Sequence, residues 1–200
     1  MKRILLSSLF IVLFAAYASS QTVEGLNVIT LRVGDNLPVS PDAGIPHLSL
    51  AYEYEFLQDA FDVETLCLGA GASIGYRHYR RTGTYNGFYF EYGDITWSLR
   101  ATAHYDLLGQ LLGLHDDHID TYATLSLGME HSRRIYIDRL TGREALNKQG
   151  DIKLPAAWSR RLLPGIQAGV RYWFTPNLGA VAEIGFDGFS FVSIGVSTCF

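Results

Sequence analysis

Several segments alternate between mostly apolar positions and positions that carry small, polar or charged residues, and the charged residues fall on the second set. Residues two apart on a β-strand share one face, so these charges are expected to point together into the interior of a closed sheet. A buried charge is unfavourable unless it is paired, which predicts an ion network that fills this interior. The predicted members of the network are Glu53, Arg77, Arg100, Glu130, Arg171 and Glu183.

Within this network, Arg171 and Glu183 flank the short segment 175–177. We expect them to be diagonal neighbours on paired strands and to depend on each other for charge compensation. The main interpretation of the network is a structural plug of salt bridges. A gated ion path and a catalytic pair of carboxylates are the two alternatives.

Three pairs of adjacent arginines are expected at the outer ends of three strands. The planar guanidinium forms two parallel hydrogen bonds with phosphate, so these pairs predict contact with the phosphates of a lipid surface. Ordinary solvated charge, with the aliphatic stems lying along the protein, is the alternative. The predicted lipid-phosphate contacts are Arg80, Arg81, Arg133, Arg134, Arg160 and Arg161.

No catalytic, cofactor or metal site is predicted. A serine hydrolase needs serine and histidine on one face, but the adjacent His131 and Ser132 would point to opposite faces of a strand, and the sequence contains no Gly-x-Ser-x-Gly segment. The run His115-Asp116-Asp117-His118, followed by Asp120, has the residue types of a metal site. Its spacing indicates a solvated polar turn instead.

The elements that must position these charges are eight alternating segments. An even number of strands can close into a meander that leaves no backbone unpaired in lipid. Eight strands also leave a lumen only wide enough for side chains. The sequence therefore predicts an all-β fold, an eight-stranded antiparallel up-and-down transmembrane β-barrel with a packed lumen. The predicted strands are 26–33, 47–57, 65–80, 95–107, 120–136, 164–174, 178–187 and 189–200.

Every second predicted strand carries, at or near its end, an aromatic residue that shares the parity of its apolar face. If the N-terminus lies on the inner side of the membrane, these ends meet at one rim and form an aromatic girdle. Segments 34–46, 81–94 and 137–163 are then long outer loops, and 175–177 is a tight inner turn. The predicted girdle residues are Phe56, Tyr105, Phe174 and Phe200.

Residues 1–20 have the features of a secretory signal: Lys2 and Arg3 precede an apolar run, and small residues follow it. The mature chain, residues 21–200, is expected to be one barrel domain. Its formal charge becomes −6 when the two basic residues are removed from a chain of charge −4, which gives no indication of a nucleic-acid partner. Together with the amphipathic strand that ends on Phe200, the signal predicts export through the periplasm to the outer membrane.

The segment from Gly165 to Phe200 resembles the last three strands of the small outer-membrane β-barrel proteins of Gram-negative bacteria. The resemblance is carried by Gly-x-Arg-Tyr-x-Phe at 169–174, Thr-Pro-Asn-Leu-Gly at 175–179 and Ala-Glu-Ile-Gly at 182–185. It implies an eight-stranded barrel in the outer membrane and little about activity, because most members have no assigned one.

We therefore expect an integral outer-membrane protein that is not an enzyme and has a structural or surface-contact role through its outer loops. A narrow conduit for small solutes is the first alternative, and a lipid A-modifying enzyme is the second. The expected partners are outer-membrane lipid, lipopolysaccharide and, during insertion, the barrel-assembly machinery. No nucleic-acid partner is expected, and the protein is expected to be a monomer.

Overall fold

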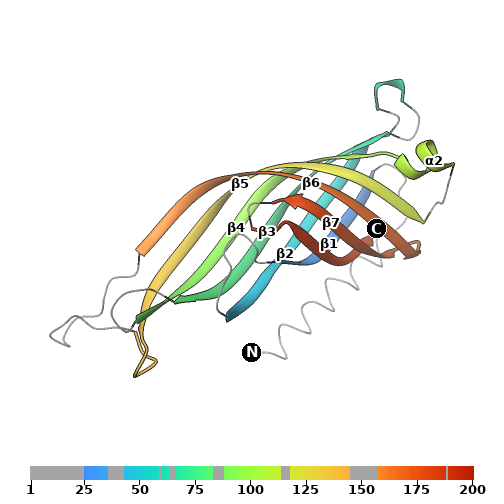
Figure 1. The fold of residues 1–200 in the computed structure, drawn as a ribbon. Helices are drawn as coiled ribbons and strands as arrows, with labels where there is room; N and C mark the ends of the chain where they lie inside the picture. Colours follow the sequence, from blue (N-terminus) through green and yellow to red (C-terminus); the bar gives the residue numbers. More distant parts are fainter. Residues whose placement is uncertain are drawn as a thin grey trace.

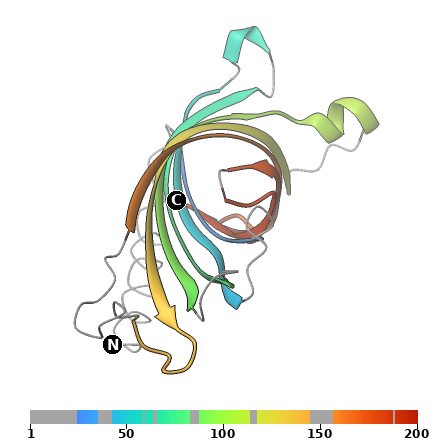
Figure 2. The same ribbon diagram turned by 60° about the vertical axis from the view of Figure 1, so that its left-hand side comes forward.

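The computed structural model describes residues 25–35, 43–58, 60–63, 66–82, 88–113, 118–144, 157–187 and 189–200. In these segments eight antiparallel strands follow one another around a closed barrel, and β8 pairs back onto β1 (Figures 1 and 2). This confirms the predicted fold class. The strands are β1 (Leu26–Gly34), β2 (Ala43–Leu57), β3 (Cys67–Thr82), β4 (Phe88–His104), β5 (Ile119–Asp138), β6 (Ala157–Thr175), β7 (Leu178–Phe186) and β8 (Val192–Cys199).

Alternation along the strands separates an apolar outer surface from a polar lumen. On β5, Leu125 and Leu127 point outward and are 62% and 55% exposed, whereas Thr124, which directly precedes Leu125, points inward and is 1% exposed. A continuous exposed apolar surface of this kind is unfavourable in water and suits hydrocarbon. The same outward belt includes Leu31, Leu50, Ile74, Leu99, Ile166, Ile184 and Ile194.

The strands differ greatly in length, so the barrel is closed along only part of its height. β5 and β6 have 20 and 19 residues, whereas β7 and β8 have nine and eight. The pairing of β6 with β7 stops at Ile166 and Phe186, and the earlier part of β6 pairs with β5 alone. Five strands, β2 to β6, therefore continue past the closed barrel as a sheet (Figure 1). We call it the outer extension: residues 43–45, 77–82, 88–94, 131–138 and 157–161.

Segments 88–94 and 157–163 were expected to be loops, and this prediction is wrong. β4 begins at Phe88 opposite Asp138, and β6 begins at Ala157 opposite Arg134. Both segments carry aromatic or charged residues on both faces, because neither face of the outer extension has to meet the hydrocarbon of the bilayer. The apolar–polar alternation that marks the other strands is therefore missing there.

The segment between β7 and β8 shows the opposite difference, since residues 189–191 were predicted as strand and form part of a turn. The carboxylate of Asp187 accepts hydrogen bonds from the backbone N–H groups of Phe189 and Ser190, both at 2.8 Å. These bonds turn Phe189 into the lumen, where it is 1% exposed. This short connection therefore closes the outer mouth of the barrel from inside.

At the opposite rim, a tight turn at Pro176 and Asn177 joins β6 to β7. The 3-10 helix η1 (Ala60–Asp62) follows β2, and the helix α2 (Leu107–Leu112) follows β4. In the part of the chain that the structure describes, no helix has the length and apolarity needed to cross a membrane.

The belt can be tested by placing arginine at two outward positions of β5. Leu127→Arg puts a charge within the belt and should lower the free energy of unfolding by about 2–4 kcal/mol, whereas Ile135→Arg in the outer extension should cost about 1 kcal/mol or less. The measurement is guanidinium unfolding of the barrel in lipid vesicles. Equal losses for the two variants would show that the lipid boundary does not lie between these positions.

Candidate functional site

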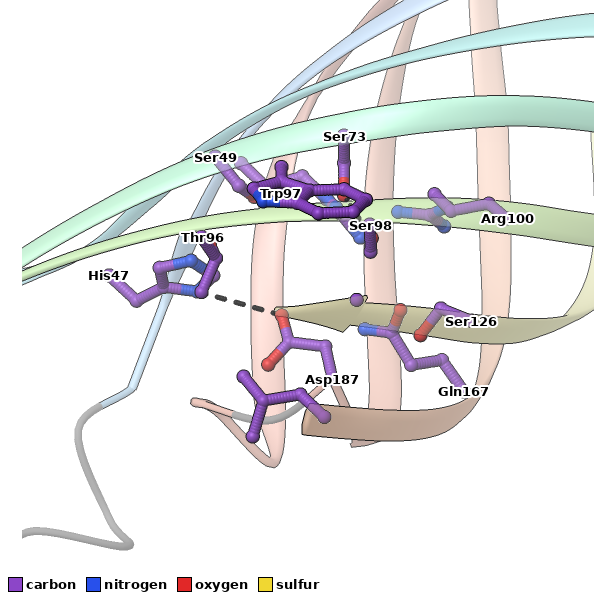
Figure 3. Close-up of a pocket in the computed structure, with 13 residues that line it drawn as sticks. His47, Ser49, Ser73, Thr96, Trp97, Ser98, Arg100, Ser126, Gln167 and Asp187 are labelled. Carbon is purple, nitrogen blue, oxygen red and sulfur yellow. Dashed lines mark hydrogen bonds and ion pairs between the residues drawn. The ribbon is translucent and has the colours of Figure 1, made fainter. Parts of the chain in front are cut away.

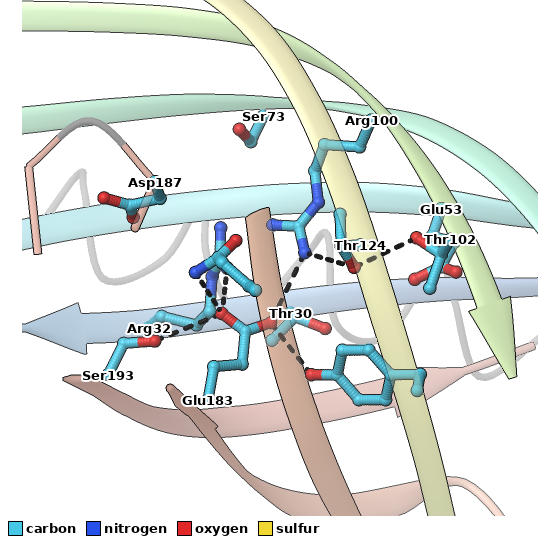
Figure 4. Close-up of polar contacts among 12 residues, drawn as sticks. Thr30, Arg32, Glu53, Ser73, Arg100, Thr102, Thr124, Glu183, Asp187 and Ser193 are labelled. Carbon is cyan, nitrogen blue, oxygen red and sulfur yellow. Dashed lines mark hydrogen bonds and ion pairs between the residues drawn. The ribbon is translucent and has the colours of Figure 1, made fainter. Parts of the chain in front are cut away.

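Glu183 on β7 is the centre of a network that crosses the lumen (Figure 4). Its side chain is 2% exposed, and its two carboxylate oxygens accept hydrogen bonds from five other strands. The donors are Arg32, Arg100 at 3.3 Å, Tyr122 at 2.8 Å, Gln167 at 3.0 Å and Ser193 at 3.1 Å. Because these residues come from β1, β4, β5, β6 and β8, one carboxylate joins most of the barrel wall.

A second cluster lies towards the inner rim and is built around Arg171. Its guanidinium Nη1 lies 2.8 Å from Asp120 Oδ2, and Nη2 lies 3.8 Å from Glu53 Oε2. His104 bridges the same two carboxylates, with Nδ1 2.8 Å from Asp120 and Nε2 2.8 Å from Glu53. Arg171 is 1% exposed, so the cluster compensates a cation that water does not reach.

The third cluster lies at the outer mouth of the closed barrel. Arg77 donates from Nε and Nη2 to Asp94 Oδ2 at 3.0 and 2.7 Å, and its Nη2 lies 3.8 Å from Glu130. Ser132 donates to the other oxygen of Asp94 at 2.6 Å. The Arg77 guanidinium lies 4.0 Å from the ring centroid of Phe189, so the plug residue of the β7–β8 turn packs directly on this ion pair.

All six residues of the predicted lumen network face the lumen and are buried, with exposed fractions of 8% or less. The expectation that Arg171 and Glu183 compensate each other's charge is wrong, because Arg171 pairs with Asp120 and Glu53. Arg171 is aligned with Val181, so Glu183 is its diagonal neighbour as expected. The oxygens of Glu183 are instead taken by Arg32 and Arg100, which reach it across the lumen.

The sequence prediction also missed four of the residues that form the ion pairs of the clusters: Arg32, Asp94, His104 and Asp120. Arg32 lies on the same face of β1 as Val28 and Thr30, and all three are buried. This alternation could have identified Arg32 as a lumen residue from the sequence. Asp94 was assigned to an outer loop, and Asp120, although it begins the predicted strand 120–136, was interpreted as part of a solvated polar turn; the two residues belong to β4 and β5.

Between the outer and central clusters lies a small polar cavity of about 20 Å³ (Figure 3). Its lining includes Arg32, His47, Ser73, Ser98, Arg100 and Gln167. Arg32 Nε and His47 Nε2 are buried there without a protein partner. This volume and polarity suit about one buried water molecule. The lumen at this height is thus filled by side chains.

The six rim arginines do not lie on one surface, because adjacent residues on a strand point to opposite faces. Arg81, Arg134 and Arg161 have the parity of the lumen side, and Arg161 pairs with Glu130 at 3.0 Å. Arg80, Arg133 and Arg160 have the parity of the lipid side. The expectation that all six arginines contact lipid phosphate therefore holds geometrically for three positions at most.

The four girdle residues all fall at the rim where β2, β4, β6 and β8 end. Phe56 and Phe174 are 55% and 59% exposed, and Tyr105 and Phe200 are half-buried. The backbone of Phe200 exchanges hydrogen bonds of 3.2 and 3.0 Å with Asn27, which fixes the C-terminus beside β1.

The geometry brings no serine–histidine pair together at the positions considered from the sequence. Ser132 faces the lumen and donates to Asp94, whereas His131 has the outward parity. Asp120 belongs to the inner lumen cluster instead of a solvated turn, and residues 115–117 lie outside the described residues. Among the residues that the structure describes, no group of histidine, cysteine and acidic side chains is arranged to hold a metal ion.

No protein-family model and no curated protein matches the amino-acid sequence. Among solved structures, a major outer membrane protein of Thermus thermophilus is similar with 16% identity, a TM-score of 0.58 and coverage of 88% of this chain and 99% of that chain. Neisserial surface protein A is 11% identical with a TM-score of 0.45, over 88% of this chain and 95% of that chain. The likeness to the Thermus protein shows that this chain has the fold of the small outer-membrane β-barrel proteins, as the resemblance in sequence implied.

The central cluster can be tested by a double-mutant cycle. Glu183→Gln leaves two buried guanidinium groups without their carboxylate and should lower the free energy of unfolding by about 3–5 kcal/mol. Combination with Arg32→Met should show a coupling energy of about 1–3 kcal/mol, because the two side chains form an ion pair. Unfolding by guanidinium, followed by tryptophan fluorescence, gives the four free energies.

The matched control combines Glu183→Gln with Arg77→Met, which belongs to the outer cluster. These two losses should add within about 0.5 kcal/mol, because the residues share no partner. A strong coupling energy between Arg77 and Glu183 would contradict the division into separate clusters. A coupling energy near zero between Arg32 and Glu183 would contradict their ion pair.

Proposed function

We propose that this chain is an integral outer-membrane protein with a surface-contact role, and that it is neither a porin nor an enzyme. The observation that carries the proposal is the contrast between a lumen filled by ion clusters and a long outer extension. The first leaves little room for a solute, and the second offers a broad surface beyond the membrane.

The proposed location rests on the apolar belt, on the girdle at one rim and on the export signal at residues 1–20. The structurally similar protein of Thermus thermophilus is named as an outer membrane protein, which agrees with this location. In this proposal residues 21–200 are inserted by the barrel-assembly machinery as a monomer. The rim with the short turn at Pro176 then faces the periplasm, and the outer extension faces the cell exterior.

The outer extension has half-buried aromatic and arginine side chains that suit a contact surface. Tyr92 stacks on the buried Tyr79 with ring centroids 4.7 Å apart, and Phe90 packs edge-on against Tyr136 at 5.2 Å. Arg134 lies 5.5 Å from the ring centroids of both Phe90 and Tyr136. Aromatic residues and arginine are enriched at protein interfaces, and mutual packing of this kind keeps them rigid before binding.

The conduit alternative would need a path past three clusters and past Phe189. The enzyme alternative would need a nucleophile beside a base, yet His104 is held between two carboxylates. Both alternatives are tested by conductance in planar bilayers and by lipid A mass profiles of a deletion strain. We expect no regular channel steps and an unchanged profile; steps would favour a conduit, and altered lipid A would favour an enzyme.

The orientation is tested by single cysteines in a chain whose Cys67 and Cys199 are replaced by alanine. Leu140 lies two residues after the end of β5, and its side chain is 95% exposed. The variant Leu140→Cys should therefore react with a membrane-impermeant maleimide on intact cells. Pro176→Cys, which is exposed at the opposite rim, should react only after the outer membrane is permeabilised. Labelling of Pro176→Cys alone on intact cells would mean that the barrel has the reverse orientation.

A further inference from the structure

We propose that the lipid side of the β5–β6 pair, at Arg133 and Arg160, binds the phosphate groups of lipid A in the outer leaflet. The inference rests on the proposed outer-membrane location and adds a specific lipid site to it. The site has four side chains in two aligned pairs: Arg133 faces Trp158, and His131 faces Arg160. The two arginines are therefore diagonal neighbours on one face.

Both arginines stand immediately beyond the apolar belt. A strand tilted by about 40° rises about 2.5 Å per residue along the barrel axis, so a belt about 25 Å tall takes about ten residues. On β6, Leu162 lies ten positions from Tyr172, and Arg160 is the next outward residue. On β5, Met129 lies ten positions from Ile119, and His131 and Arg133 follow it. The guanidinium groups thus lie at the height of lipid head groups.

Two cations on neighbouring strands repel each other unless an anion lies between them. No carboxylate of the described residues forms an ion pair with Arg133 or Arg160, and both side chains are exposed. On the β4 side Arg133 is aligned with Gly93, where a Cβ would meet nothing within 4 Å. The space beside the arginine is therefore open to a ligand that arrives from the membrane.

The remaining rim arginines are less suited to the same ligand. Arg80 also faces outward, but its Nε lies 3.2 Å from Glu91, so a carboxylate already occupies its fork. Arg161 pairs with Glu130, and Arg134 packs between Phe90 and Tyr136 on the lumen side. The structure thus selects one outward face, that of Arg133 and Arg160, from the six rim arginines.

The chemistry of the face fits a phosphorylated glycolipid. Each guanidinium can form two charge-assisted hydrogen bonds with phosphate oxygens. Trp158 is 70% exposed, and its ring centroid lies 5.8 Å from Arg133. An exposed tryptophan at this height is typical of the boundary between acyl chains and polar head groups. Trp158 holds Arg133 by a cation–π contact, and its exposed ring edge can face lipid.

The experiment measures lipid A bound to the barrel by native mass spectrometry, after reconstitution in phosphatidylcholine nanodiscs that contain bisphosphorylated lipid A. The double variant R133Q/R160Q should retain about tenfold less lipid A than the unmodified protein. The matched control R134Q/R161Q changes the adjacent inward arginines by the same charge and should retain as much as the unmodified protein. R133K/R160K keeps the charge without the fork and should be intermediate.

Folding of each variant is checked by its heat-dependent mobility on gels, and if R133Q/R160Q does not fold, the lysine variant decides. Equal retention by all variants, equal loss in both glutamine variants, or equal binding of lipid A without its phosphates would overturn the proposal. So would an unmodified dimer that R133Q/R160Q converts to monomer, since the face would then join two copies. If Leu140→Cys labels on intact cells while lipid A retention is uniform, this site is wrong and the proposed location stands.

Discussion

The need to bond every backbone group within hydrocarbon determines the rest of this structure. A sheet with free edges would leave N–H and C=O groups unpaired in lipid, so the strands must close on themselves. Eight strands close into a barrel whose lumen has room only for side chains. Those side chains have the parity opposite to that of the lipid belt and are therefore polar. Charges such as Glu183 and Arg171 are then buried, and each needs partners from across the lumen.

The same alternation applies beyond the membrane, but its consequence changes there. In the outer extension both faces meet polar surroundings, so consecutive residues can be alike in type and yet serve different surfaces. Arg133 and Arg134 are adjacent, but one contacts Trp158 on the lipid side and the other contacts Phe90 and Tyr136 on the inner side. A doubled arginine on a strand is therefore two separate interactions, and the strand register decides the partner of each.

The sequence predicted the features that depend on local alternation and not those that depend on the whole barrel. The strand count, the lipid parity of Phe56 and Phe174, and the lumen parity of Glu53 and Arg171 follow from spacing alone. The partner of Glu183 does not, because Arg32 reaches it through the closure of β1 onto β8 and Arg100 reaches it across the lumen. Segments 88–94 and 157–163 were hidden for a related reason: outside lipid a strand needs no apolar face. The turn that carries Phe189 was also not predicted, because it depends on one side chain: the carboxylate of Asp187 accepts hydrogen bonds from the backbone N–H groups of Phe189 and Ser190.

A continuous series of contacts connects the filled lumen to the outer extension. Phe189 lies on Arg77, whose guanidinium is also 5.0 Å from the ring centroid of Tyr79, and Tyr79 stacks on Tyr92. Phe90 follows, with its ring centroid 6.4 Å from that of Tyr92, and contacts Tyr136 in turn. The ion pair of Arg77 with Asp94 therefore supports the mouth of the barrel and the base of the extension together. A lumen that is packed in this way holds the outer surface in one conformation, which is the arrangement that the proposed contact role requires.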